Sequence, residues 1–137
     1  MRNFLILLAT GLSFLVSCKK TAEPVDIVGE WQLSDYQTKA VTIGSEKVDI
    51  YVQFSADKSF SLYQMLGSGR YKKFSGTYAV SADNVLSGTY SGGGSWASTY
   101  YVSLEGSKLI LTILPEEKEV QTFTSTTIPE SVKNNIY

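Results

Sequence analysis

Hydrophobic and polar residues alternate over several short stretches of this 137-residue chain. In residues 48–55 every second residue from Val48 to Phe54 is apolar, and the residues between them are polar or tyrosine. Because successive side chains of a strand point to opposite faces, this pattern predicts a strand with one buried face. The alternation recurs in residues 59–66, 70–81, 86–90, 98–104, 109–113 and 120–126. The chain is therefore predicted to be built from short strands.

The first of these strands is predicted in the segment Ile27–Leu33. Trp31 and Leu33 fall on one of its faces, and Glu30 and Gln32 fall on the other. Gly29 has no Cβ, so another backbone or an aromatic ring can approach closely where the strand begins. We expect Trp31 to plug the base of the barrel, with Gly29 as a structural residue beside it.

The links between the predicted strands are short and rich in turn-forming residues, such as Ser55–Lys58, Gly67–Gly69 and Ala82–Asn84. Short links join antiparallel neighbours and leave no room for the crossover helices of a parallel sheet. About eight strands in such a meander leave two exposed edges unless the sheet closes. The fold expected is all-β, an up-and-down antiparallel barrel with a short helical turn over residues 128–133. A two-layer sandwich is the alternative.

The N-terminal leader has a different composition. Arg2 precedes the apolar run Phe4–Val16, which is shorter than the about 20 residues of a membrane-spanning helix and is typical of a signal-peptide core. The only cysteine of the chain ends the sequence Leu15-Val16-Ser17-Cys18, which resembles the bacterial lipobox. The resemblance implies cleavage before Cys18, attachment of a diacylglyceryl group to its thiol and acylation of the new amine.

The leader divides the chain into a signal peptide at residues 1–17, a tether at residues 18–26 and a domain at residues 27–137. A secretory signal with a chance cysteine is the alternative interpretation. Lys19 and Lys20 occupy the place where surface-displayed lipoproteins of the Bacteroidetes often carry acidic residues. We therefore expect a lipid-anchored protein of the outer membrane that faces the periplasm, with surface display as the alternative.

The composition argues against several function classes. The chain has no histidine, which removes the commonest general base and metal ligand. No nucleophile is paired with a base and no phosphate-binding loop is present, so we expect no enzyme activity, no cofactor and no metal. The 12 basic residues are scattered among 13 acidic ones, which argues against nucleic-acid binding. Glu116, Glu117 and Glu119 are interpreted as a solvated turn.

The aromatic residues are the candidates for ligand binding. An eight-stranded barrel is wide enough either to be filled by its own side chains or to hold one small ligand. If a cavity exists, Tyr78, Tyr90 and Tyr100 would supply hydroxyl groups beside apolar walls. The alternative is a filled core in which their hydroxyls bond to the backbone. Trp96 follows three consecutive glycines and is either an aromatic lip for a ligand or partner, or a cap folded onto the barrel end.

Several motifs together resemble the small lipocalin-like lipoproteins of the Bacteroidetes. They are Gly29-Glu30-Trp31, the path from Phe54 to Phe60, the pair Gly76-Thr77-Tyr78 and Gly88-Thr89-Tyr90, and the ending Ile128–Val132. The resemblance covers residues 27–133 and implies an up-and-down barrel on a lipid anchor. We expect a monomer that binds a small apolar or amphiphilic ligand in the barrel or at its mouth. The alternative is an envelope interaction module that binds a protein or polysaccharide through its rim loops.

Overall fold

The computed structural model describes residues 23–38, 48–67 and 69–137. Eight strands and one short helix follow one another along the chain: β1 (Gly29–Thr38), β2 (Val48–Phe54), β3 (Ser59–Leu66), β4 (Lys72–Val80), β5 (Val85–Tyr90), β6 (Thr99–Glu105), β7 (Lys108–Leu114), β8 (Glu119–Ser125) and α1 (Glu130–Lys133). Among these residues no helix is long and apolar enough to cross a membrane.

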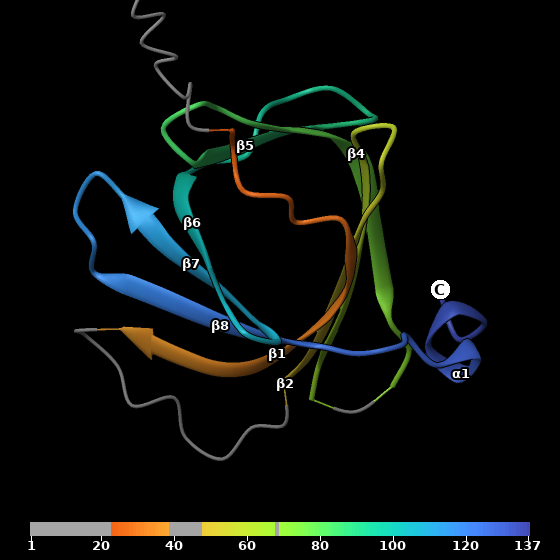
Figure 1. The fold of residues 1–137 in the computed structure, drawn as a ribbon. Helices are drawn as coiled ribbons and strands as arrows, with labels where there is room; N and C mark the ends of the chain where they lie inside the picture. Colours follow the sequence, from red (N-terminus) through yellow and green to blue (C-terminus); the bar gives the residue numbers. More distant parts are fainter. Residues whose placement is uncertain (1–22, 39–47, 68) are drawn as a thin grey trace, which may run out of the picture.

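The strands form a closed barrel in which each one pairs with its neighbours in sequence. Closure is made by β1 and β8, which pair antiparallel from Trp31 opposite Ser125 to Thr38 opposite Glu119. Figure 1 shows β1 and β8 side by side in the wall. The prediction of an up-and-down barrel is confirmed, and the sandwich alternative is wrong because the first and last strands share one ladder.

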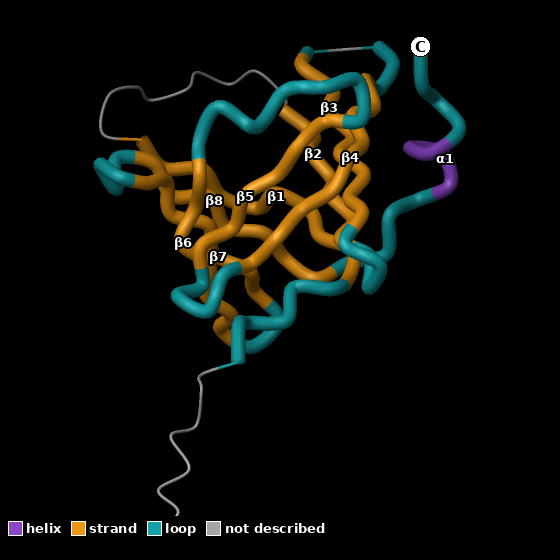
Figure 2. The backbone as a smooth tube through the Cα atoms, turned by 90° about the horizontal axis from the view of Figure 1, so that it is seen from above, coloured by secondary structure: helices purple, strands orange, loops and turns teal. Residues whose placement is uncertain are grey.

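One end of the barrel, here called the base, carries the turns at residues 55–58, 81–84 and 105–107. The other end, here called the mouth, carries the links at residues 67–71, 91–98 and 115–118. In Figure 2 the link from β5 to β6 runs along the upper edge of the barrel, whereas the N-terminal segment enters at the lower edge. The two ends differ in how completely the strands pair.

The base is closed by Trp31. Its side chain is 7% exposed, and its indole Nε1 donates a hydrogen bond of 3.0 Å to the backbone oxygen of Ile27. Gly29 has a backbone φ of +149°, a value that residues with a Cβ rarely adopt. The Trp31 ring lies against this glycine. Trp31 and Gly29 therefore lie together at the base.

The N-terminal segment before β1 belongs to the domain earlier than residue 27. Val25 packs against the interior cluster, and its backbone N–H donates to Asn84 Oδ1 at 2.9 Å. Ile27 is only 1% exposed. The expected tether at residues 18–26 therefore ends before Val25, and its first residues lie outside the described part of the chain.

The C-terminal segment covers part of the outer wall. Ile128 and Val132 pack on the outward side chains of Tyr51, Tyr63 and Tyr71, and α1 stands outside the barrel in Figure 1. Lys133 of α1 pairs with Glu30 of β1 at 3.3 Å. The helical turn expected at residues 128–133 is confirmed. It is α1, and Pro129 is its N-cap residue. The segment gives the barrel a second, external hydrophobic cluster.

The ladders become incomplete toward the mouth. β1 pairs with β2 only from Gly29 to Gln32, and β5 pairs with β6 only at Val85 and Leu86. The rest of β5 pairs instead with its own following link, through a bridge between Thr89 and Ser95. The wall between β5 and β6 is thus completed by this link rather than by a continuous ladder.

Candidate ligand-binding site

A cavity of about 210 Å³ lies inside the barrel and opens toward the mouth. Its lining is mostly apolar and comes from six strands and the β5–β6 link: Val52, Phe54, Phe60, Leu62, Leu86, Tyr90, Trp96, Ala97, Ser98, Tyr100, Leu111, Gln121 and Phe123. Apolar walls with a few polar groups are typical of small-molecule sites. The barrel interior is therefore filled at the base and hollow toward the mouth.

Trp96 forms one wall of this cavity. Its backbone N–H donates to the oxygen of Gly88 at 2.8 Å, and its ring lies so close to Gly88 that a Cβ there would overlap it. The half-buried ring meets Phe60 edge-on at 5.0 Å and Tyr100 at 6.5 Å between centroids. Of the two expectations for Trp96, the structure favours a residue folded onto the barrel, in contact with the cavity.

The three candidate tyrosines separate into two groups. Tyr90 and Tyr100 line the cavity, and Tyr90 also contacts Phe60 and Phe74. Tyr78 does not line it. Its hydroxyl donates to the backbone oxygen of Ser55 at 2.9 Å, in the turn between β2 and β3. Tyr78 thus matches the alternative in which a tyrosine hydroxyl bonds to the backbone at the rim of a packed core.

The polar side of the cavity is formed by residues of β8, β1 and β6. Gln121 lines the cavity, and its Nε2 donates to Glu119 Oε1 at 2.6 Å. The Tyr36 hydroxyl also bonds to Glu119, and Gln121 bonds to the Tyr100 oxygen. These four residues, Tyr36, Tyr100, Glu119 and Gln121, are here called the polar sector. It places a carboxylate next to an otherwise apolar space.

Burial and charge act together on Tyr100. Burial raises the pKa of its phenol above the ordinary value, and the nearby Glu119 carboxylate raises it further, because both disfavour a phenolate. The hydrogen bond from Gln121 acts in the opposite direction. Tyr100 is therefore a neutral hydroxyl at physiological pH, beside a negative charge.

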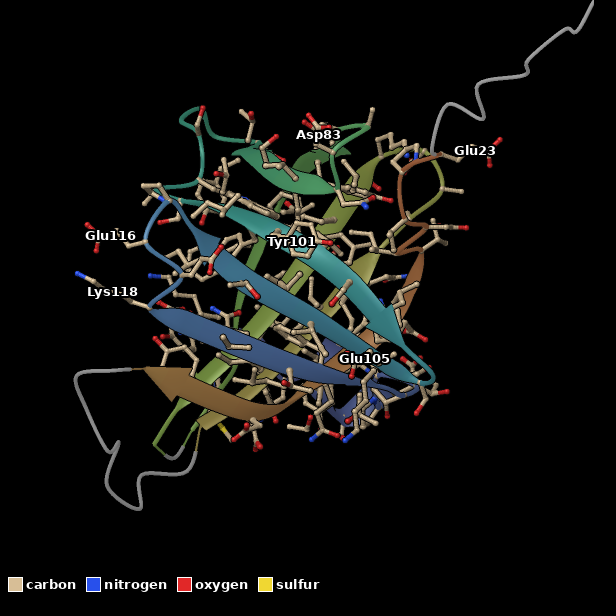
Figure 3. The ribbon with its side chains drawn as sticks, turned by 60° about the vertical axis from the view of Figure 1, so that its left-hand side comes forward. Glu23, Asp83, Tyr101, Glu105, Glu116 and Lys118 are labelled. Carbon is tan, nitrogen blue, oxygen red and sulfur yellow. The ribbon has the colours of Figure 1, made fainter. Side chains whose placement is uncertain are left out.

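The sequence predicts a solvated turn that contains Glu116, Glu117 and Glu119. Only part of this segment is a solvated turn in the structure. Glu116 and Lys118 pair with each other on the surface, and Figure 3 shows them pointing away from the barrel. Glu117 is exposed, whereas Glu119 is half-buried in the polar sector. The interpretation was wrong for Glu119, because β8 begins at this residue. No group of three or more metal-ligating side chains occurs in the described residues.

Glu119 and Gln121 were missed as site residues in the sequence. Their spacing could have identified them. Glu119, Gln121 and the buried Phe123 occupy every second position of β8 and therefore share one face of the strand. Tyr36 gave no such signal. A β-bulge between Leu33 and Asp35 shifts the alternation of β1 just before it. Cys18 lies outside the described residues.

Comparisons with known proteins agree with this geometry. The family model described as a lipocalin-like domain matches residues 27–111. An uncharacterized protein from Bacteroides eggerthii has a crystal structure similar to this one, with 28% sequence identity and a TM-score of 0.55. The match covers 74% of this chain and 100% of that chain. A search of curated proteins found no match.

Two further structures are less similar. Human cRBP IV is 16% identical with a TM-score of 0.43, and the match covers 75% of this chain and 100% of that chain. A mutant of the fluorescent protein UnaG is 12% identical with a TM-score of 0.42, over 73% of this chain and 96% of that chain.

Proposed function

Because this chain belongs to the lipocalin-like domain family, we propose that it is a ligand-binding lipoprotein. In this proposal the cavity at the mouth takes up a small apolar or amphiphilic molecule, and an acylated Cys18 holds the monomeric domain at the membrane. No chemical step is involved. The protein acts by binding, release and presentation of its ligand.

The cavity is the observation that supports the binding role. Its volume of about 210 Å³ lies below the range of roughly 300–1,000 Å³ for drug-sized ligands. At about 30 Å³ per water molecule it would hold roughly seven waters. We therefore propose a ligand smaller than a long-chain lipid, or an amphiphile that places only one end in the barrel.

A cavity-filling variant tests this proposal. Leu62→Trp adds an indole to the cavity wall, whereas Tyr101→Trp adds one to a position that is 45% exposed on the outer face of β6 (Figure 3). Native mass spectrometry of protein from its own host should show a co-purified small molecule with the wild type and with Tyr101→Trp, and its loss with Leu62→Trp. Equal ligand content in all three proteins would refute interior binding.

The anchor is tested separately. Replacement of Cys18 by Ser removes the thiol that the lipobox pattern marks for acylation, so the variant should move from the membrane fraction to the soluble envelope fraction. The mass of the wild-type protein should correspond to a chain that begins at Cys18 and carries acyl groups. Continued sedimentation of Cys18→Ser with membranes would contradict the anchor.

The side of the membrane requires a further test. We propose that the domain faces the periplasm from the outer membrane. Protease added to intact cells should then leave the protein whole, and it should be digested after the outer membrane is permeabilised. Digestion in intact cells would instead indicate surface display.

A further inference from the structure

No charged side chain is among the residues that line the cavity, but one carboxylate lies directly behind its wall. Glu119, in the polar sector on β8, β1 and β6, accepts a hydrogen bond of 2.6 Å from the lining residue Gln121. We infer that the polar end of the ligand is a neutral or positively charged hydrogen-bond donor, such as an alcohol or an ammonium group, and not a carboxylate. This inference rests on the proposed function, because it concerns the ligand of the same cavity.

Hydrogen bonding inside the polar sector supports a donor on the ligand. Glu119 accepts hydrogen bonds from Gln121 Nε2 and from the Tyr36 hydroxyl, so these two donors turn toward the carboxylate. Gln121 also interacts with Tyr100, whose hydroxyl can accept as well as donate. With Nε2 directed at the Glu119 carboxylate, the amide oxygen of Gln121 is an acceptor that the sector offers to a ligand. A ligand donor would find acceptors here.

Charge supports the same conclusion. A carboxylate head group placed against Gln121 would lie near the Glu119 carboxylate, and like charges repel more strongly in a half-buried site than in water. After the larger effect of burial, the Glu119 carboxylate also raises the pKa of Tyr100, because it disfavours a second negative charge nearby. An ammonium group would instead gain attraction from Glu119, and an alcohol would be unaffected by its charge.

Lys72 is the nearest alternative partner for an anionic head group. It shares the inward face of β4 with Phe74, and its Nζ lies 5.2 Å from the centre of that ring. β4 stands four strands from β8 in the closed barrel, so Lys72 lies across the mouth from Glu119. Lys72 is exposed and does not line the cavity. An exposed ammonium binds a carboxylate weakly because water screens the pair.

Three probes with the same alkyl chain separate these possibilities: octylamine, octanol and octanoate. Binding to the purified protein is measured at pH 7 by titration calorimetry, with wild type, Glu119→Gln, Lys72→Met and Glu105→Gln. Glu105 is the exposed last residue of β6, beside the β6–β7 turn at the base (Figure 3), and controls for the loss of one negative charge. Circular dichroism and melting of each variant confirm that it is folded.

We expect octylamine and octanol to bind wild type at least tenfold more tightly than octanoate. Glu119→Gln should remove most of this preference by weakening octylamine and strengthening octanoate, whereas Glu105→Gln should not. If octanoate binds as tightly as octylamine, or if Lys72→Met abolishes octanoate binding of that strength, the inference is wrong although the cavity still binds ligands. If none of the three probes binds, the proposed function itself is contradicted.

Discussion

The two tryptophans of the chain stand over glycines at opposite ends of the barrel. Trp31 at the base lies against Gly29, is 7% exposed and bonds to the backbone of Ile27. Trp96 at the mouth lies against Gly88, is half-buried and lines a cavity. The same pairing of an indole with a glycine therefore closes one end of the barrel and borders a cavity at the other.

Strand pairing explains the difference. Trp31 belongs to a strand that is paired on both sides at that level, with Val52 of β2 and Ser125 of β8. Its ring is therefore held in a fixed frame. Trp96 belongs to a link, and its position depends on one backbone bond to Gly88 and on ring contacts with Phe60 and Tyr100. A side chain held in this way can move when a ligand enters the cavity, while the strand pairing of the barrel stays intact.

Replacement of Trp31 by Ala should give the largest loss of stability. Removing a buried aromatic side chain costs about 3–5 kcal/mol, because apolar contacts are lost and a cavity remains. The hydrogen bond to Ile27 is lost as well. Chemical denaturation followed by far-UV circular dichroism measures the change in the free energy of unfolding.

The matched variant is Trp96→Ala. Its ring is only half-buried and already borders an open space, so we expect it to cost less than half as much stability as Trp31→Ala. It should nevertheless weaken ligand binding, whereas Trp31→Ala, if it remains folded, should not. Equal losses of stability at both positions would remove the distinction between base and mouth.

Gly88→Ala should have the next largest effect. The new Cβ would overlap the Trp96 ring, so the indole must move out of its place. Overpacking of this kind costs about 1–3 kcal/mol. The fluorescence of Trp96 should shift toward that of an exposed indole, with Trp96→Phe as the control that identifies its signal. An unchanged spectrum would show that the ring does not depend on Gly88.

The base could be predicted from the sequence, because its determinants are local. The alternation of apolar residues and the spacing of Gly29 and Trp31 specify a first strand whose tryptophan faces inward. The outer cluster is less visible, since Tyr51 and Tyr63 lie on what the alternation marks as a solvent face. The C-terminal segment covers them, and that contact joins residues far apart in the chain.

The mouth could be predicted only in part. Tyr90, Tyr100 and Trp96 are aromatic residues near the β5–β6 link, and all three line the cavity. Tyr78 has the same alternation as Tyr90, but its strand places it at the base. The cavity itself is lined by residues of six strands and the β5–β6 link, so it is a property of the closed barrel and not of any single strand.

Tyr78→Phe should have a smaller effect and sharpens the comparison among the tyrosines. The change removes one hydrogen bond to the Ser55 oxygen and leaves the ring contact with Phe54, at 4.8 Å between centroids, in place. The expected cost is about 0.5–1.5 kcal/mol. Ligand binding should be unchanged, as measured by calorimetry. A loss of binding without a loss of stability would place Tyr78 in the site.

The smallest effect concerns the pH dependence of Tyr100. Its pKa in the folded protein is raised, first by burial and then by Glu119, so the unfolded chain loses this proton at a lower pH than the folded chain does. The stabilising contribution is therefore complete below the ordinary tyrosine pKa of about 10 and is lost as the pH rises through the folded value. Between these two pH values the free energy of unfolding should fall less steeply for Tyr100→Phe than for wild type.

A titration of the Tyr100 phenolate by absorbance tests the contribution of Glu119. Glu119→Gln should lower the pKa of Tyr100, because the variant removes the nearby negative charge and leaves the effect of burial. An identical titration in Glu119→Gln would mean that the carboxylate does not act on Tyr100, and the charge assigned to the polar sector at the mouth would then have no effect on the cavity.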